Sequence, residues 1–177
     1  LDEDIEEGHE SQPVNEEKDA YSLLREIRSK NLDRVLIGSL NINSVRNKFD
    51  ALSDLIVGKL EILLISESKL DASFYSSNFM IPGFSTPYRR DRNCFGGGIL
   101  VYIREDIPSK LLATIQIPDN VECLIIEIRL KKIKWILINL YNPSKSQISS
   151  QMAFLGKAID HYSTHYDNIL VLGDFNT

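Results

Sequence analysis

Apolar residues along the chain gather in short continuous runs that are separated by polar segments. Runs rich in Ile, Leu and Val occupy positions 34–40, 61–67, 99–103, 121–130, 134–141 and 169–172. The run at 61–67 is nearly continuous, as expected of a strand that is covered on both faces. The pattern therefore predicts six strands.

Other apolar residues recur at helical spacing between these strands. Leu23, Leu24 and Ile27 follow Asp19, which is a suitable N-cap, and they precede Asn31 near the expected helix end. Similar spacing predicts helices across residues 49–56 and 149–162. Strands that alternate with helices define an α/β domain, and residues 34–67 are expected to form a βαβ unit.

Two segments carry glycine, proline or serine in place of a periodic pattern. Residues 68–93 contain Pro82, Gly83 and Pro87, so we expect a loop there. The triplet Gly96–Gly98 precedes a strand and lacks the Lys-Ser/Thr of a phosphate-binding loop. It is predicted to be a tight turn that leads into the strand.

Charge divides the chain into an acidic leader and a mildly basic remainder. Residues 1–19 hold nine acidic residues and one lysine, so they are expected to be a disordered leader. Residues 20–177 hold 16 acidic and 19 basic residues, a net charge of +3, and form one expected domain. No apolar stretch reaches the roughly 20 residues of a membrane span. Two isolated cysteines, Cys94 and Cys123, favour a reducing, intracellular compartment.

Polar residues stand at the carboxyl ends of several predicted strands, where α/β sheets commonly bind ligands. They are Asn41, Glu67, Tyr141, Asp174 and Asn176. If the backbone stays extended, Asn43 points the same way as Asn41, and Asn176 the same way as Asp174. Oxygen donors with few carboxylates suit Mg²⁺, or Mn²⁺, better than zinc. Such a site could neutralise a phosphodiester during hydrolysis.

The order of these motifs resembles that of the endonuclease/exonuclease/phosphatase superfamily. The motifs are residues 40–43 (LNIN), 66–70 (SESKL), 96–99 (GGGI), 139–143 (NLYNP) and 173–177 (GDFNT). Residues 41–50 and 88–93 most closely resemble the apurinic-endonuclease-like domain of non-LTR (LINE-type) retrotransposons, which nicks target DNA.

The resemblance implies a fold and a role for each site residue. The fold is a DNase I-like four-layer α/β sandwich of two face-to-face sheets with flanking helices. Glu67 resembles the metal-binding glutamate, Asn41 the asparagine beside it, and Tyr141 the phosphate-contacting tyrosine. Asp174 resembles the aspartate that activates water, and Asn176 the asparagine that stabilises the transition state.

The same family carries a Ser-Asp-His motif that we expect beyond Thr177. The chain is therefore expected to be the N-terminal part of a DNA endonuclease, inactive alone, with a reverse transcriptase domain in the same polypeptide and nuclear localisation. We expect only the first sheet and the start of the second. The inner face of the first sheet would then be uncovered, and the chain prone to aggregation.

Several basic residues are candidates for DNA contact, and two histidines are not candidates for catalysis. Arg46, Arg89, Arg90 and Arg92, together with Lys131, Lys132 and Lys134, could bind a DNA backbone. His161 and His165 fall on a predicted helix, where a solvated face is the favoured interpretation. Alternative functions are a repair-type apurinic endonuclease, a lipid or inositol phosphoesterase, or a non-catalytic remnant that acts as a binding fragment.

Overall fold

Two four-stranded β-sheets pack face to face in the computed structural model, which describes residues 19–144, 146 and 148–176. The first sheet has the order β1-β2-β4-β3, with β1 and β2 parallel. The second has the order β5-β6-β7-β8, with β7 and β8 parallel. The strands are β1 (Ile37–Asn41), β2 (Ile62–Ser66), β3 (Tyr88–Arg90), β4 (Ile99–Ile103), β5 (Ser109–Leu111), β6 (Glu122–Leu130), β7 (Ile133–Tyr141) and β8 (Ile169–Asp174).

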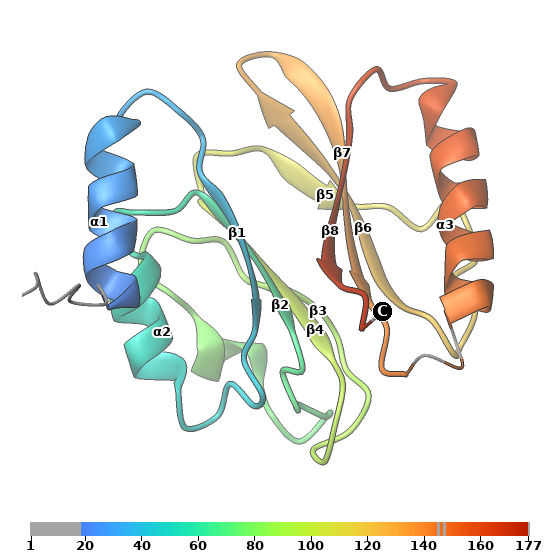
Figure 1. Ribbon diagram of the computed structural model, residues 1–177, viewed down its shortest axis with the longest axis horizontal. Coiled ribbons are helices and arrows are strands. Elements are labelled where there is room, and N and C mark those ends of the chain that lie inside the picture. The colour runs from blue at the N-terminus through green and yellow to red at the C-terminus, as the bar shows by residue number, and fades with distance from the viewer. Residues whose placement is uncertain (1–18, 145, 147, 177) are drawn as a thin grey trace, which may run out of the picture.

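Helices cover the outer faces of both sheets (Figure 1). Helices α1 (Ala20–Lys30) and α2 (Phe49–Ile56) flank the first sheet, and α3 (Ile148–Ser163) flanks the second. A short 3₁₀ helix, η1, spans Ser76–Phe79. The layers therefore run helix, sheet, sheet, helix, and the predicted α/β sandwich is confirmed.

The predicted cap of α1 is confirmed, because the Asp19 side chain accepts a hydrogen bond from the Ser22 N–H at 2.9 Å. The predicted disordered leader falls almost wholly on residues 1–18, outside the described part of the chain. No helix among the described residues is long and apolar enough to cross a membrane.

One of the hydrophobic core clusters lies between the sheets, which corrects the expectation of an uncovered first sheet. Leu64 and Val101 of the first sheet pack in one cluster with Ile126 and Leu137 of the second, and all four are almost fully buried. The second sheet is more complete than expected because the long hairpin of β6 and β7 gains a partner on each side, β5 and β8. It is therefore wide enough to cover the first.

Two short strands were not predicted from the sequence pattern. Tyr88–Arg90 forms β3 inside the segment that was predicted to be a loop, and Ser109–Leu111 forms β5. Each is three residues long and lies at a sheet edge. Because each is so short and lies at an edge, local composition carries little information about them.

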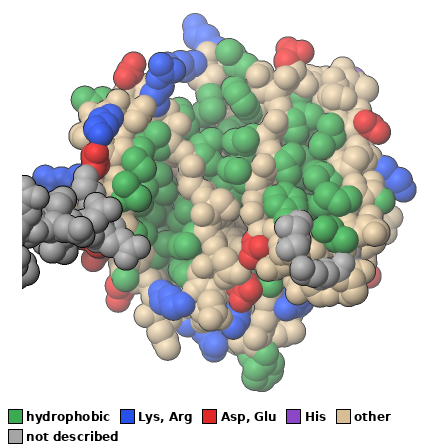
Figure 2. Space-filling view, viewed as in Figure 1, with side chains coloured by type: hydrophobic (Ala, Val, Ile, Leu, Met, Phe, Trp, Pro, Cys, Tyr) green, Lys and Arg blue, Asp and Glu red, His purple; other side chains and the backbone are tan. Residues whose placement is uncertain are grey.

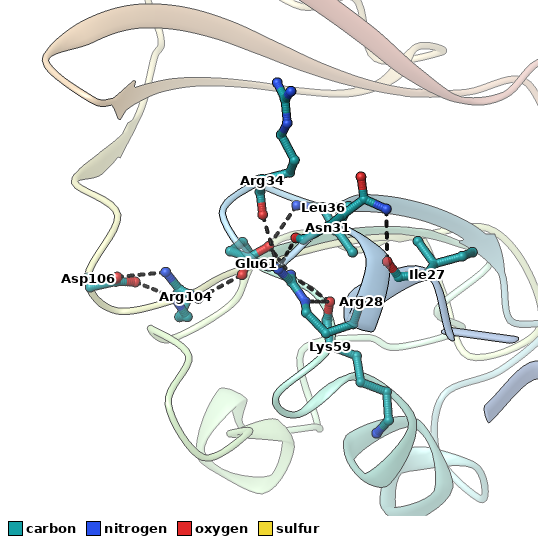
Figure 3. A network of polar contacts seen from close by, with 9 residues as sticks. All are labelled: Ile27, Arg28, Asn31, Arg34, Leu36, Lys59, Glu61, Arg104 and Asp106. Carbon is teal, nitrogen blue, oxygen red and sulfur yellow. Dashed lines mark hydrogen bonds and ion pairs between the residues drawn. The ribbon is translucent and has the colours of Figure 1, made fainter. Parts of the chain in front are cut away.

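A polar network fixes α1 to the end of the first sheet that is remote from the C-terminal end of β2 (Figure 3). The buried Glu61 accepts hydrogen bonds from the Leu36 N–H at 2.7 Å and from Arg104 Nη1 at 2.7 Å, and it forms an ion pair with Arg28. Arg28 also donates to the carbonyl of Lys59. Glu61 thus joins α1 to the strands beneath it.

Candidate active site

The parallel strand pairs bring the predicted site residues to one end of the sandwich. Asn41 is the register partner of Ser66, which precedes Glu67. Tyr141 is the register partner of Asp174 in the other sheet. Each sheet therefore contributes two neighbouring strand ends with polar side chains. In Figure 2, acidic side chains lie close together just below the middle of the view, near the level at which β1 and β8 end in Figure 1.

Hydrogen bonds join these side chains across the two sheets. Asn41 Nδ2 donates to Glu67 Oε1 at 2.9 Å and to Asp174 Oδ2 at 2.8 Å. The Tyr141 hydroxyl donates to the same Glu67 oxygen at 3.0 Å. Burial, and then the hydrogen bond to Glu67, raise the pKa of Tyr141 well above its usual value, so its hydroxyl remains a donor at neutral pH. Four of the five predicted residues thus form one cluster.

The side chains two residues farther along do not follow the predicted extended geometry. Asn43 has a φ of 46°, and its Oδ1 accepts a hydrogen bond from Lys69. Asn176 has a φ of 41°, and its Nδ2 donates to the carbonyl of Asn142 at 2.7 Å. The expected extended geometry was wrong at both positions, because the backbone turns into the left-handed region shortly after β1 and after β8. Asn176 instead ties the ends of β7 and β8 together.

The loop that carries Glu67 is held in an uncommon backbone conformation. Glu67 has a φ of 55° and Lys69 a φ of 54°, and such backbone strain in non-glycine residues concentrates at functional sites. The Ser44 N–H donates to the Glu67 carbonyl at 2.8 Å, and the Ser68 N–H donates to the carbonyl of Gly98 at 3.0 Å. The loop is therefore clamped between the end of β1 and the glycine triplet.

The glycine triplet is confirmed as a tight turn that leads into β4. Gly98 has a φ of 81°, and a Cβ there would lie 2.4 Å from Ser68 Oγ. At Gly97 a Cβ would lie 2.4 Å from the guanidinium of Arg92. A side chain at Gly97 or Gly98 would collide with its neighbour, and the positive φ of both residues favours glycine as well.

Glu122 is a structural residue of the site that the sequence analysis missed. It begins β6 opposite Tyr141, and its carboxylate accepts from the Gly98 N–H at 2.6 Å and from Arg92 Nη1 at 2.8 Å. Burial raises its pKa despite these donors. One acidic residue at the start of an otherwise apolar run was the only sequence pattern that marked it.

The oxygen donors present suit a hard divalent cation. Glu67 Oε1 accepts two hydrogen bonds, whereas no partner for Oε2 is found in the described part of the chain. Glu67 Oε2 and the side-chain amide oxygen of Asn41 are ligand types that Mg²⁺ prefers. Residues 19–144, 146 and 148–176 contain no group of three or more His, Cys, Asp or Glu that could hold a metal. The site therefore suits an ion that keeps several waters.

The four arginines proposed for DNA contact lie in different environments. Arg89 is largely engaged within the protein, because its guanidinium donates to Asp91, to two backbone carbonyls and to Ser76, and its side chain is 14% exposed. Arg92 bridges Glu122 and the Gly96 carbonyl. Arg46 bonds the Cys94 carbonyl and lies over the Phe74 ring, and Arg90 bonds the Pro118 carbonyl. Arg46, Arg90 and Arg92 remain candidates.

The lysines near the β6–β7 turn lie far from the candidate site. Lys131 and Lys132 occupy the turn, at the end of the hairpin opposite Glu122 and Tyr141. Nine-residue strands separate the two ends by roughly 30 Å. His161 lies on α3, as predicted, and His165 follows its end.

Two facing sheets with carboxylates at adjoining strand ends define a DNase I-like α/β fold. The family model described as "Endonuclease/Exonuclease/phosphatase family" matches residues 38–177, and the chain belongs to this family. Its members are hydrolytic nucleases, phosphatases and phosphodiesterases that use divalent metal ions. No curated protein matches the chain.

Solved structures share the fold at low sequence identity. A Neisseria 3′ phosphatase, NExo, bound to a product DNA hairpin is 20% identical with a TM-score of 0.58, and the match covers 81% of this chain and 58% of that one. Caenorhabditis elegans TDP2 is 14% identical with a TM-score of 0.60, over 81% and 47%. The human Nocturnin catalytic domain is 14% identical with a TM-score of 0.55, over 78% and 62%. The chain thus spans less than two thirds of the length of each of these proteins.

Proposed function

We propose that this chain supplies the metal-binding half of a DNA phosphodiesterase site. The observation that carries the proposal is the position of Asn41, whose amide holds Glu67 of one sheet and Asp174 of the other in a single cluster. Because Asn41 donates to both acidic side chains, it offsets the repulsion that would otherwise separate them. The cluster thus keeps two carboxylates together at the strand ends.

Each residue has a role that its contacts support. Glu67 and Asn41 would hold Mg²⁺ or Mn²⁺. The bound ion would supply positive charge for the phosphate oxygens. Tyr141, which stays protonated, is a hydrogen-bond donor beside Glu67 and suits contact with a phosphate oxygen. Asp174 is suited to orient water and accept its proton. Asn176 Nδ2 donates one N–H to the Asn142 carbonyl, and its second N–H would donate to the charge that develops on phosphate.

We infer further that the natural polypeptide is a retrotransposon endonuclease that nicks target DNA in the nucleus, next to a reverse transcriptase domain. Residues 41–50 and 88–93, with their likeness to LINE-type endonucleases, support this assignment. Arg46 and Arg92 lie in or beside these segments and would contact DNA phosphates.

Two measurements test the proposal. Titration of the chain with Mn²⁺, followed by the electron paramagnetic resonance of free Mn²⁺, should reveal one site that Glu67→Ala removes. The natural polypeptide that carries this sequence should nick supercoiled plasmid in Mg²⁺, and Glu67→Ala should lower the rate by at least about 100-fold.

The matched control is Glu105→Ala, which removes an exposed carboxylate far from the cluster. It should leave Mn²⁺ binding and nicking unchanged. Equal Mn²⁺ binding by the wild type and Glu67→Ala would contradict the assignment of the metal site. Cleavage of inositol phosphates but not DNA would contradict the proposed substrate.

A further inference from the structure

Phe95 is presented to solvent on a turn that is itself firmly held. Its side chain is 87% exposed, more than any other large hydrophobic residue described. Asn93 Oδ1 accepts from the N–H groups of Phe95 and Gly96, both at 3.0 Å. Arg92 Nε donates to the Gly96 carbonyl at 3.0 Å. The backbone is thus fixed on both sides of a ring that packs against little of the protein.

The turn is attached to the candidate metal site. Phe95 is three residues from Gly98, so the two Cα atoms lie within about 11 Å. The Gly98 carbonyl accepts from the N–H of Ser68, the neighbour of Glu67. In Figure 1 the turn between β3 and β4 extends beyond the ends of β1 and β2. The turn that carries the ring therefore continues directly into the segment that holds the Glu67 loop.

Basic side chains surround the base of the turn. Arg46 Nη2 donates to the Cys94 carbonyl at 3.3 Å, and Arg92 lies one residue before Asn93. The surface thus combines cations, which attract a phosphate backbone, with one exposed aromatic ring, on which a base can stack.

We propose that Phe95 stacks on an unpaired base next to the phosphodiester that is cleaved. The inference rests on the proposed function and adds a substrate class: nucleic acid with an unstacked base near the target phosphate. Insertion of a ring into an intact duplex must first separate stacked base pairs, which costs free energy. A base that is already unpaired avoids this cost, and one ring on a narrow turn offers a surface for one base.

Binding of DNA hairpins that contain 2-aminopurine tests the proposal on the chain itself, with EDTA present to prevent cleavage. Stacking on Phe95 should quench 2-aminopurine at an unpaired position, and this hairpin should bind more tightly than its fully paired equivalent. Phe95→Ala should weaken binding of the unpaired hairpin about tenfold and remove the quenching, whereas Phe95→Trp should preserve both.

Leu32→Ala is the matched control, because Leu32 is 77% exposed and lies far from the site, before β1. It should bind like the wild type. Equal affinity and quenching in Phe95→Ala and the wild type would overturn the inference while leaving Glu67-dependent Mn²⁺ binding, and so the proposed function, intact. Absence of binding to either hairpin would overturn both the inference and DNA as the substrate.

Discussion

The hydroxyl of Tyr141, on the second sheet, donates to Glu67 Oε1, on the first, at 3.0 Å. This bond links the two halves of the sandwich at the candidate site. Because Tyr141 is 4% exposed, water cannot easily replace its hydroxyl once removed. The bond therefore contributes both to stability and to the position of the metal-binding carboxylate.

Tyr141→Phe should lower the free energy of unfolding by about 1–2 kcal/mol and weaken Mn²⁺ binding several-fold. Urea denaturation and Mn²⁺ titration measure the two effects. Tyr102→Phe is the control, because Tyr102 is fully buried in a different core cluster and donates to the Phe79 carbonyl at 3.1 Å. It should lose similar stability but keep the Mn²⁺ affinity of the wild type. If Tyr141→Phe and Tyr102→Phe change the Mn²⁺ affinity equally, Tyr141 has no specific role in metal binding.

Gly98→Ala should destabilise the chain more than Gly83→Ala. The two glycines have nearly the same φ, 81° and 78°, so both substitutions carry a similar backbone cost. A Cβ at Gly83 meets nothing within 4 Å, whereas one at Gly98 lies 2.4 Å from Ser68 Oγ. The clash should add about 1–3 kcal/mol, or roughly 3–9 °C in Tm. Indistinguishable melting temperatures would show that the Glu67 loop can move away freely.

Glu61→Ala should lower the stability of the chain without changing its metal binding. It leaves Arg28, whose side chain is 14% exposed, without its carboxylate partner, and it removes the acceptor of the Leu36 N–H. We expect a loss of about 3 kcal/mol in the free energy of unfolding, measured by urea denaturation at neutral pH. Mn²⁺ affinity of the folded protein should not change, because Glu61 and Glu67 stand at opposite ends of β2. A large change in Mn²⁺ affinity would mean that the Glu61 network influences the geometry of the candidate site.

Glu122 should make a contribution to stability that decreases as pH rises. Burial raises its pKa in the folded state, so the folded chain binds this proton more tightly than the unfolded chain does. The contribution is full below the unfolded pKa of about 4.5 and is lost as pH rises through the higher folded value.

Urea denaturation between pH 4 and pH 7 measures this contribution as the difference between the wild type and Glu122→Gln. The free energy of unfolding of the wild type should fall relative to that of Glu122→Gln as pH increases. Glu105→Gln, at an exposed position, should show no such trend. A constant difference for Glu122→Gln across the range would contradict the role of burial.

The amino-acid sequence by itself determined the strands of the core, the three helices and the residue types at the strand ends. Apolar runs such as those of β2 and β4 are local patterns, and burial on both faces requires them. Asn41 could be predicted to lie near Glu67, and Tyr141 near Asp174, because parallel strands end at the same edge of a sheet. The family resemblance added their expected roles.

Only the tertiary structure decided which of these side chains contact one another. Asn41 and Asp174 are 133 positions apart, and their contact depends on how two sheets pack. Asn43 and Asn176 turn away from the predicted direction, and the guanidinium of Arg89 is taken up by Asp91 and backbone carbonyls. The role of Glu122 likewise depends on how the two sheets pack, because its carboxylate accepts from the Gly98 N–H of the other sheet's turn. Local patterns specify what must be buried, whereas contacts between distant polar groups depend on the geometry of the whole fold.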